Sequence, residues 1–281
     1  MIPVFYTDSQ VHEPDSFSKS PFKPKLLVPL IDQEGGFKFM DPRMIGSISA
    51  DRLKLVHDPR FVDDVFACKR PDGFGKSNQE SVRAIRYTVG NFVLAAEWAA
   101  AVSGNPIVWS LTSGFHHACY FSAGTFCTFN ALMLSAFELR KFHGTRTLIV
   151  DEDAHFGNGC TDIIKHLEMD HYCRYMQSIH THSGSHMLNL VGYEKALRRL
   201  IKTFKPTLIM YQAGADNWCK DPLGGSMTKE ELFERDLITF RAAREANIPV
   251  VCNLAGGYAE NFDDTLGIHM ATGRAMKEVY S

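Results

Sequence analysis

The amino-acid sequence predicts an α/β fold of three layers, αβα, with a mostly parallel sheet in the middle. From about residue 79 onward, short apolar runs of strand length alternate with longer segments whose apolar residues recur at helical spacing. Strands that are separated by helices join in parallel, and the helices then cover both faces of the sheet. Runs that are apolar throughout, such as Leu148–Val150, are typical of strands buried on both faces. Neither an internal repeat nor a linker is visible, so we expect one domain over residues 1–281.

The composition excludes several classes of partner. The chain has 281 residues, of which 45% are hydrophobic and 22% charged, with a formal net charge of -2. This balance predicts neither a nucleic-acid nor a membrane partner, and no apolar run approaches the roughly 18 residues that span a bilayer. The seven cysteines are scattered without a C-x-x-C pair, which predicts reduced thiols rather than a disulfide framework. Because the first residues also lack the pattern of a signal peptide, we expect a cytoplasmic protein.

Residues 1–60 are expected to form an irregular arm packed on this domain. They contain several prolines and show little periodicity, apart from a short edge strand near the start and one short helix near Pro29. A long helix is then expected to begin at Ser77, because Ser77-x-x-Glu80 has the pattern of a capping box, and to end at Gly104.

The remaining elements follow from apolar runs, capping patterns and chain breakers. Thr228-x-x-Glu231 is a second capping box, and Gly144 and Pro206 end helices. We expect strands at 106–110, 147–150, 207–212 and 249–254, with a strand end near 177–180. We expect helices at about 128–142, 161–167, 193–204, 229–246 and 264–277.

The stretch 147–159, TLIVDEDAHFGNG, carries the strongest chemical signal. After its apolar strand it places Asp151, Asp153 and His155 on alternate residues, so in an extended chain the three side chains point the same way. Two carboxylates and an imidazole are costly to bury together unless they bind a cation or each other. The stretch therefore indicates a metal site, with a polar strand exit and an Asp–His pair as the structural alternative.

Three other strand ends carry unusual residues, at the edge where ligands bind in open α/β sheets. They are Gly114-Phe115-His116-His117, Asp216, and Gly256-Gly257-Tyr258. Each alone has an ordinary explanation, such as a packed histidine pair, a turn cap or a tight turn. Their occurrence at equivalent strand ends in one chain predicts a single active site.

At these positions the sequence resembles the zinc-dependent histone deacetylase family, including its bacterial acetylpolyamine amidohydrolase relatives. The matching segments span residues 112–261 and are TSGFHHA, GTFCTFN, VDEDAHFGNG, SIH, QAGADNWCKDPLGG and AGGYAEN. The resemblance implies the arginase/deacetylase fold. It also implies a hydrolase that removes an acetyl-type acyl group from an acylated lysine or amine through a metal-activated water. That acylated substrate is the expected partner.

The resemblance also implies roles for individual residues. Asp153, His155 and Asp216 match the ligands of a catalytic Zn²⁺, or of Fe²⁺, and three protein ligands leave a position open for water. The positions that match catalytic residues are His116, His117, Asp151, Asn158 and Tyr258. Asp151 matches the residue that orients His116, and Asn158 stands where the partner of His117 is expected. We expect His117 to shuttle the proton and Tyr258 to polarise the acyl carbonyl.

Contacts with substrate and with a second cation are implied in the same way. The substrate is expected to meet Gly114, Phe115, Phe126, Leu223, Gly256 and Gly257. A structural K⁺ site is expected near Asp151, Asp153, His155 and Ser178. The sequence departs from the common family pattern at Asn158, where many members have Asp, at Phe156, where histidine is common, and at Gly75. Many deacetylases have at this last position an aspartate that holds a peptide backbone, so we expect a preference for small acylated amines.

Three other functions are alternatives to this interpretation. An arginase-like ureohydrolase holds two metals and needs an aspartate two residues after Asp216, where this chain has Trp218. A non-catalytic acyl-chain-binding protein would be expected to lose Tyr258 or a metal ligand, and none is lost. A separate metal tract, His180-Thr-His182-x-x-x-His186, is better explained as a loop near the site entrance, because its first histidine lies in the SIH segment.

Overall fold

Parallel strands form the centre of the molecule. The computed structural model describes residues 1–13, 18–104, 106–177 and 189–281. Within these ranges seven strands form one sheet in the order β2-β1-β3-β7-β6-β4-β5, and all neighbours are parallel. The strands are β1 (Ile2–Phe5), β2 (Phe37–Phe39), β3 (Ile107–Ser110), β4 (Thr147–Asp151), β5 (Cys173–Gln177), β6 (Leu208–Gln212) and β7 (Val250–Asn253).

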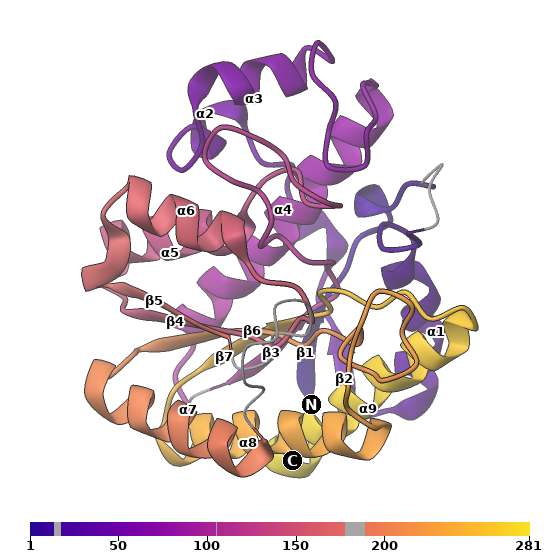
Figure 1. Ribbon diagram of the computed structural model, residues 1–281, viewed down its shortest axis with the longest axis vertical. Helices are drawn as coiled ribbons and strands as arrows, with labels where there is room; N and C mark the ends of the chain where they lie inside the picture. Colours follow the sequence, from indigo (N-terminus) through magenta and orange to yellow (C-terminus); the bar gives the residue numbers. More distant parts are fainter. Residues whose placement is uncertain (14–17, 105, 178–188) are drawn as a thin grey trace.

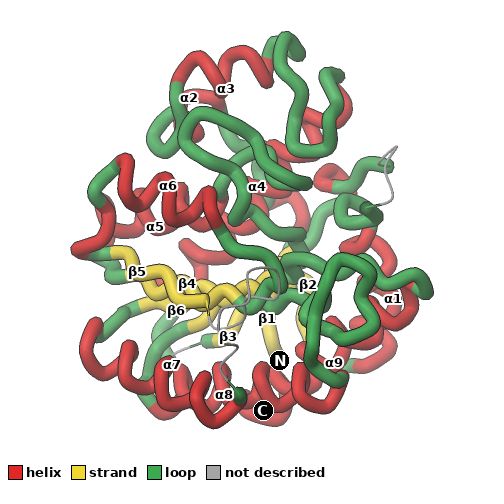
Figure 2. The backbone as a smooth tube through the Cα atoms, in the orientation of Figure 1, coloured by secondary structure: helices red, strands yellow, loops and turns green. Residues whose placement is uncertain are grey.

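Helices cover both faces of this sheet, which confirms the predicted three-layer arrangement. In Figure 1, α4, α5 and α6 lie on one face with α2 and α3 beyond them, and α1, α7, α8 and α9 lie on the other. Figure 2 shows the strands crossing the middle of the molecule between these two layers. The helices are α1 (Lys23–Glu34), α2 (Ala50–Leu53), α3 (Pro59–Phe66), α4 (Gln79–Ala101), α5 (Ala131–His143), α6 (Asn158–His166), α7 (Leu190–Phe204), α8 (Lys229–Glu245) and α9 (Phe262–Tyr280). Short 3-10 helices lie at 8–10, 42–44 and 169–171.

The central strands are buried on both faces, as their apolar runs predicted. Every residue of β3, β4, β6 and β7 is buried. One hydrophobic cluster includes Phe92 of α4 and Leu132 of α5, and another includes Leu197 of α7 and Phe240 of α8. Burying one such side chain contributes about 1.5–3 kcal/mol to the free energy of unfolding. The two clusters therefore hold the strands rigidly in place beneath the loops at the edge of the sheet.

Polar residues end five adjacent strands at one edge of the sheet. In register across these strands stand Ser110, Asn253, Gln212, Asp151 and Gln177. Because all the strands run in the same direction, their carboxyl ends and the loops that follow lie at this same edge. The four motif-bearing loops identified from the sequence all leave from it.

Local sequence signals located most helix ends. Thr228 caps α8 and Glu231 returns the hydrogen bond, as predicted, and Gly144 ends α5 in the left-handed region. The capping box predicted at Ser77 is wrong, because the N-cap of α4 is Asn78, whose side chain accepts from the Ser81 N–H. Asparagine caps as well as serine does, so two adjacent residues competed for the same position.

Residues 1–60 are more regular than the sequence predicted. Strand β1 pairs with β2 on one side and β3 on the other, so it is an interior strand rather than an edge strand. Its Val4 and Phe5 are fully buried. Helix α1 has 12 residues and carries Pro24 in its first turn, where no N–H is needed. The segment is therefore not an irregular arm, because its order comes from packing against α9 and the sheet rather than from local periodicity.

Two further observations concern membranes and thiols. No helix within the described ranges is both long and apolar enough to cross a membrane. The seven cysteines are all free thiols, so packing rather than disulfide bonding holds the layers together.

Candidate active site

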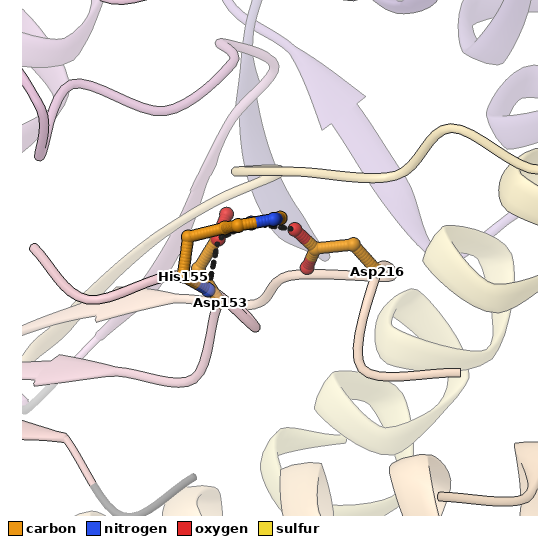
Figure 3. A group of neighbouring side chains, drawn as sticks. All are labelled: Asp153, His155 and Asp216. Atoms are coloured by element: carbon orange, nitrogen blue, oxygen red, sulfur yellow. Dashed lines mark hydrogen bonds and ion pairs between the residues drawn. The ribbon is translucent and has the colours of Figure 1, made fainter. Parts of the chain in front are cut away.

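Asp153, His155 and Asp216 converge at the carboxyl edge of the sheet. Asp153 and His155 lie in the loop after β4, and Asp216 lies in the loop after β6. Figure 3 shows the three side chains pointing toward one another. His155 Nδ1 lies 3.1 Å from Asp153 Oδ1 and 3.1 Å from Asp216 Oδ2, and one ligand atom from each residue lies within 4.8 Å of the others. Two carboxylate oxygens and one imidazole nitrogen are a donor set that suits Zn²⁺ or Fe²⁺.

Backbone N–H groups orient the two carboxylates. The Gly256 N–H donates to Asp153 Oδ2 at 2.7 Å, and the Ala154 N–H donates to Asp216 Oδ1 at 3.2 Å. This approach requires glycine at position 256, since a Cβ there would lie 2.1 Å from Asp216 Oδ2. The loop after β7 thus holds Asp153 and the loop after β4 holds Asp216, so three strand ends build one centre.

The buried carboxylates of Asp153 and Asp216 are electrostatically coupled. Burial raises the pKa of Asp216 to about 7, and the negative charge of Asp153 adds to the increase. Burial also acts to raise the pKa of Asp153, but the positive charge of His116 and the hydrogen bond with His155 outweigh it and hold that pKa well below its usual value. A divalent cation between the two carboxylates would offset their repulsion, so the electrostatics as well as the donor atoms fit a metal.

His116 lies next to the ligands, and Asp151 fixes its ring. Its Nδ1 donates to Asp151 Oδ2 at 2.7 Å, and the same oxygen accepts from the Tyr175 hydroxyl at 2.7 Å. Burial acts to lower the pKa of His116, but the charges of Asp151 and Asp153 raise it to about 9. This setting favours a positively charged imidazole and an electrostatic role for His116.

His117 has the opposite electrostatic setting. Asn158 Oδ1 lies 2.7 Å from its Nδ1 and accepts the N–H, which leaves the lone pair of the neutral ring on Nε2. Burial and the positive charge of His116 lower the pKa of His117, while the hydrogen bond with Asn158 opposes the decrease. A neutral imidazole with its lone pair on Nε2 is a proton acceptor, which favours His117 as the base.

Tyr258 follows two glycines in the loop after β7. Gly257 has a φ of +144°, in a region that L side chains rarely adopt, so glycine is needed for the turn that presents the tyrosine. The Tyr258 ring centroid lies 5.6 Å from that of Phe126. Burial, followed by the charges of Asp153 and Asp216, raises the pKa of Tyr258 well above its usual value. The phenol therefore keeps its proton and remains a hydrogen-bond donor.

Two residues of the N-terminal region reach the Tyr258 loop. Lys23 is fully buried, and its Nζ donates to the carbonyl oxygens of Ala255 at 2.7 Å and Gly256 at 3.3 Å. The Ser20 side chain hydrogen-bonds the Tyr258 side chain. The sequence analysis missed both, because the lysine lies 232 positions from its first partner and no local pattern marks it.

Asp221 is a third residue that the sequence analysis did not select. Its Oδ2 accepts from the Tyr258 N–H at 2.7 Å, and its Oδ1 accepts from the Leu223 N–H at 3.0 Å. The Leu223 carbonyl oxygen in turn lies 3.1 Å from His155 Nε2. The sequence offered one signal that could have identified Asp221, since it lies within the segment QAGADNWCKDPLGG that matches the family.

One pocket brings seven of the predicted site residues together. It encloses about 250 Å³, and its walls include Gly114, His116, His117, Phe126, Asp153, Gly256 and Tyr258. A second, more apolar cavity of about 440 Å³ shares Ser20, Ser113, Gly114 and Phe126 with it. Phe115 lines this second cavity. Of the expected substrate contacts, Gly114, Phe126 and Gly256 line the first pocket and Phe115 lines only the second. The Leu223 carbonyl oxygen lies beside His155 Nε2.

Three predictions concern the surroundings of this pocket. Gly75 lies exposed in a turn with a φ of +77°, and the carboxylate of nearby Asp72 is used internally, accepting from the Phe74 and Lys76 N–H groups and the Ser81 hydroxyl. At the expected K⁺ position, the carbonyl oxygens of Asp153 and His155 accept from Gln177. Residues that lie outside the described ranges are Ser178, His180, His182 and His186.

Comparison with known proteins agrees with this geometry. A model of the histone deacetylase domain matches residues 20–189 and 178–270. Histone deacetylase 2 of Arabidopsis thaliana is 32% identical over 208 residues, which cover 65% of this chain and 51% of that protein. The structure is similar to the HDA15 HD domain, with a TM-score of 0.80, 18% identity and coverage of 99% of this chain and 91% of that one. It is also similar to an acetylpolyamine aminohydrolase from Burkholderia pseudomallei, with a TM-score of 0.79, 15% identity and 99% coverage of both chains. These similarities confirm the predicted arginase/deacetylase fold.

Replacing Asn158 with aspartate should raise the pKa of His117. A carboxylate beside Nδ1 stabilises the imidazolium through its charge, whereas the amide offers a hydrogen bond alone. Histidine NMR titration of Asn158→Asp should show the increase directly, and any rate limb that requires neutral His117 should move to higher pH. Asn189→Asp adds the same charge at the N-cap of α7 and should leave His117 unchanged. An unshifted His117 in folded Asn158→Asp would disprove the pairing.

Proposed function

Because the chain belongs to the histone deacetylase domain family, we propose that it is a Zn²⁺-dependent amidohydrolase that removes an acetyl-type group from an acylated lysine or amine. Membership of the family supports hydrolysis of an amide bond. We propose in addition the metal, the roles of the residues and the class of substrate. One observation carries it: the ligand group of Asp153, His155 and Asp216 adjoins a pocket that also holds His117 and Tyr258.

The proposed metal ligands are Asp153, His155 and Asp216. When bound there, a divalent ion supplies Lewis acidity and makes water acidic enough to serve as a nucleophile near neutral pH. The raised pKa of Asp216 favours a proton on that carboxylate, which the ion would displace. Zn²⁺ is the proposed ion, and Fe²⁺ is the alternative that the same donor set accepts.

The chain itself supplies the proton transfers and the hydrogen bond to the oxyanion. Neutral His117 accepts a proton from the attacking water and passes it to the leaving amine nitrogen. His116, paired with Asp151, contributes positive charge. Tyr258 donates its phenolic hydrogen to the developing oxyanion, and this bond strengthens as negative charge grows.

Two alternatives fit the site less well. In the described part of the chain, the one group of potential metal ligands is Asp153, His155 and Asp216, whereas an arginase-like enzyme needs ligands for a second metal. Trp218 stands where such a ligand is required, and its side chain packs in a small hydrophobic cluster. A non-catalytic acyl-binding protein would not need Tyr258 beside a complete ligand set.

A small acylated amine is the proposed substrate class. With the Asp72 carboxylate engaged inside its own loop, the turn at Gly75 offers no side chain to hold a peptide backbone. The Burkholderia pseudomallei protein carries the name of an enzyme for such amines, although at 15% identity that likeness supports the fold alone. The proposed compartment is the cytoplasm, because free thiols suit a reducing environment.

Protein purified without chelators should contain close to one equivalent of Zn²⁺ or Fe²⁺. Asp216→Ala should lose most of this metal, since two remaining ligands hold the cation poorly. Elemental analysis measures both, and Asp170→Ala, which removes an exposed carboxylate, should retain the metal. Two tightly held equivalents per chain would favour the arginase-like alternative.

Tyr258→Phe should lower kcat by about 10²–10³, because loss of one oxyanion donor typically costs that much. Metal content and melting temperature should change little, since the ring is retained. Tyr193→Phe is the matched control: it removes a hydroxyl that bonds Thr239 in the core and should affect stability rather than kcat. Near-normal turnover by Tyr258→Phe would exclude the role assigned to this hydroxyl.

Acetylated diamines should show a higher kcat/KM than acetyl-lysine peptides derived from histone tails. Gly75→Asp should shift this ratio toward peptides, because it restores a carboxylate that can accept peptide N–H groups. Gly75→Ala tests the strain of a side chain at positive φ without that carboxylate. A higher kcat/KM for the peptides with the unmodified protein would overturn the proposed substrate class.

A further inference from the structure

The loop that carries Asp153 and His155 is tied to strand β5 by one side chain. Gln177, the last residue of β5, donates from Nε2 to the carbonyl oxygen of Asp153 at 2.9 Å and to that of His155 at 2.7 Å. These residues supply two of the three candidate metal ligands. The amide therefore spans the loop directly behind its metal-binding side chains.

The other end of the Gln177 amide fixes its orientation. Oε1 accepts from the Gly157 N–H at 3.2 Å and lies 2.9 Å from the Tyr175 hydroxyl oxygen. If the amide were reversed, its oxygen would face two carbonyl oxygens and its NH₂ group would face the Gly157 N–H, so the contacts with Asp153, His155 and Gly157 would be lost. The nitrogen must therefore face the Asp153 and His155 carbonyl oxygens.

The family resemblance implies a structural K⁺ at this place, lined by Asp151, Asp153, His155 and Ser178. A cation of this kind is held by several oxygen atoms, among them backbone carbonyls that replace its hydration shell. Here two of those carbonyls already receive N–H groups, whose hydrogens carry partial positive charge and repel a cation at the same oxygens. The residues present thus fit an internal amide better than K⁺.

We propose that the Gln177 amide takes the place of a structural monovalent cation in holding the loop of Asp153 and His155. The amide contributes two directed hydrogen bonds and, unlike an ion, cannot dissociate. It also reaches the histidine pair, because the Tyr175 hydroxyl that bonds Gln177 lies within hydrogen-bond distance of Asp151 Oδ2, which holds His116. Gln177 is therefore a positioning residue for the metal loop.

Thermal unfolding in KCl and in choline chloride at equal ionic strength tests this proposal without reference to the reaction catalysed. The unmodified protein should have the same melting temperature in both salts. Gln177→Glu keeps the size of the side chain but turns an oxygen toward the two carbonyls. This variant should be destabilised in choline chloride and specifically rescued by KCl.

Gln79→Ala is the control, since it removes an exposed glutamine amide that also donates to a backbone carbonyl, and it should respond equally to the two salts. A melting temperature of the unmodified protein that is higher in KCl would overturn the proposal, because it would show a K⁺ site that the amide has not replaced. An equal melting temperature of Gln177→Glu in the two salts would also overturn it, because K⁺ would then have no specific effect on the variant. If Gln177→Glu does not fold, Gln177→Met, which removes the donors without adding charge, provides the same comparison.

Discussion

The arrangement of the site depends on the burial of two carboxylates, Asp153 and Asp216, in one small space. Each like charge raises the free energy of the other, and burial removes the water that would screen them. The molecule offsets this cost with N–H donors from Gly256 and Ala154 and with the imidazole of His155 between the two acids. A divalent cation bound between the two acids would offset the repulsion that remains, which supports the proposed metal site.

Segments that are far away in sequence hold Tyr258, the proposed donor to the oxyanion. Lys23 brings a buried ammonium group to the carbonyl oxygens before Tyr258, and Asp221 accepts the N–H of that residue. Burial lowers the pKa of Lys23 to about 8, although the charges of Asp216 and Asp153 oppose the decrease. The two carboxylates that we propose as metal ligands thus help to keep a buried lysine charged, and helix α1 contributes a residue that holds the Tyr258 loop.

The sequence predicted what local pattern and strand direction determine. Asp153, Asp216 and Tyr258 each lie just beyond a buried strand, so a parallel sheet was enough to bring them to one edge. The role of Lys23 could not be predicted, because it depends on where α1 packs in the fold. No periodic pattern in the sequence shows where a helix will pack. Gln177 was read only as part of a strand end, since nothing in the sequence shows that its side chain turns back onto the preceding loop. The cap at Asn78 was missed for a smaller reason: Ser77 and Asn78 are both good caps, and three-dimensional packing chose between them.

The loops at the carboxyl edge of the sheet are linked by a polar row, the residues that end five strands: Ser110, Asn253, Gln212, Asp151 and Gln177. Three of these last residues send their side chains to the loop that follows a different strand. Gln212 of β6 accepts from the Phe115 N–H, Asp151 of β4 holds His116, and Gln177 of β5 holds the loop after β4. The buried core fixes the register of the strands. The positions of these side chains are therefore fixed as well, and their hydrogen bonds position the loops. The order of the strands in the sheet therefore sets which loops meet, and the hydrogen bonds of the polar row set how closely.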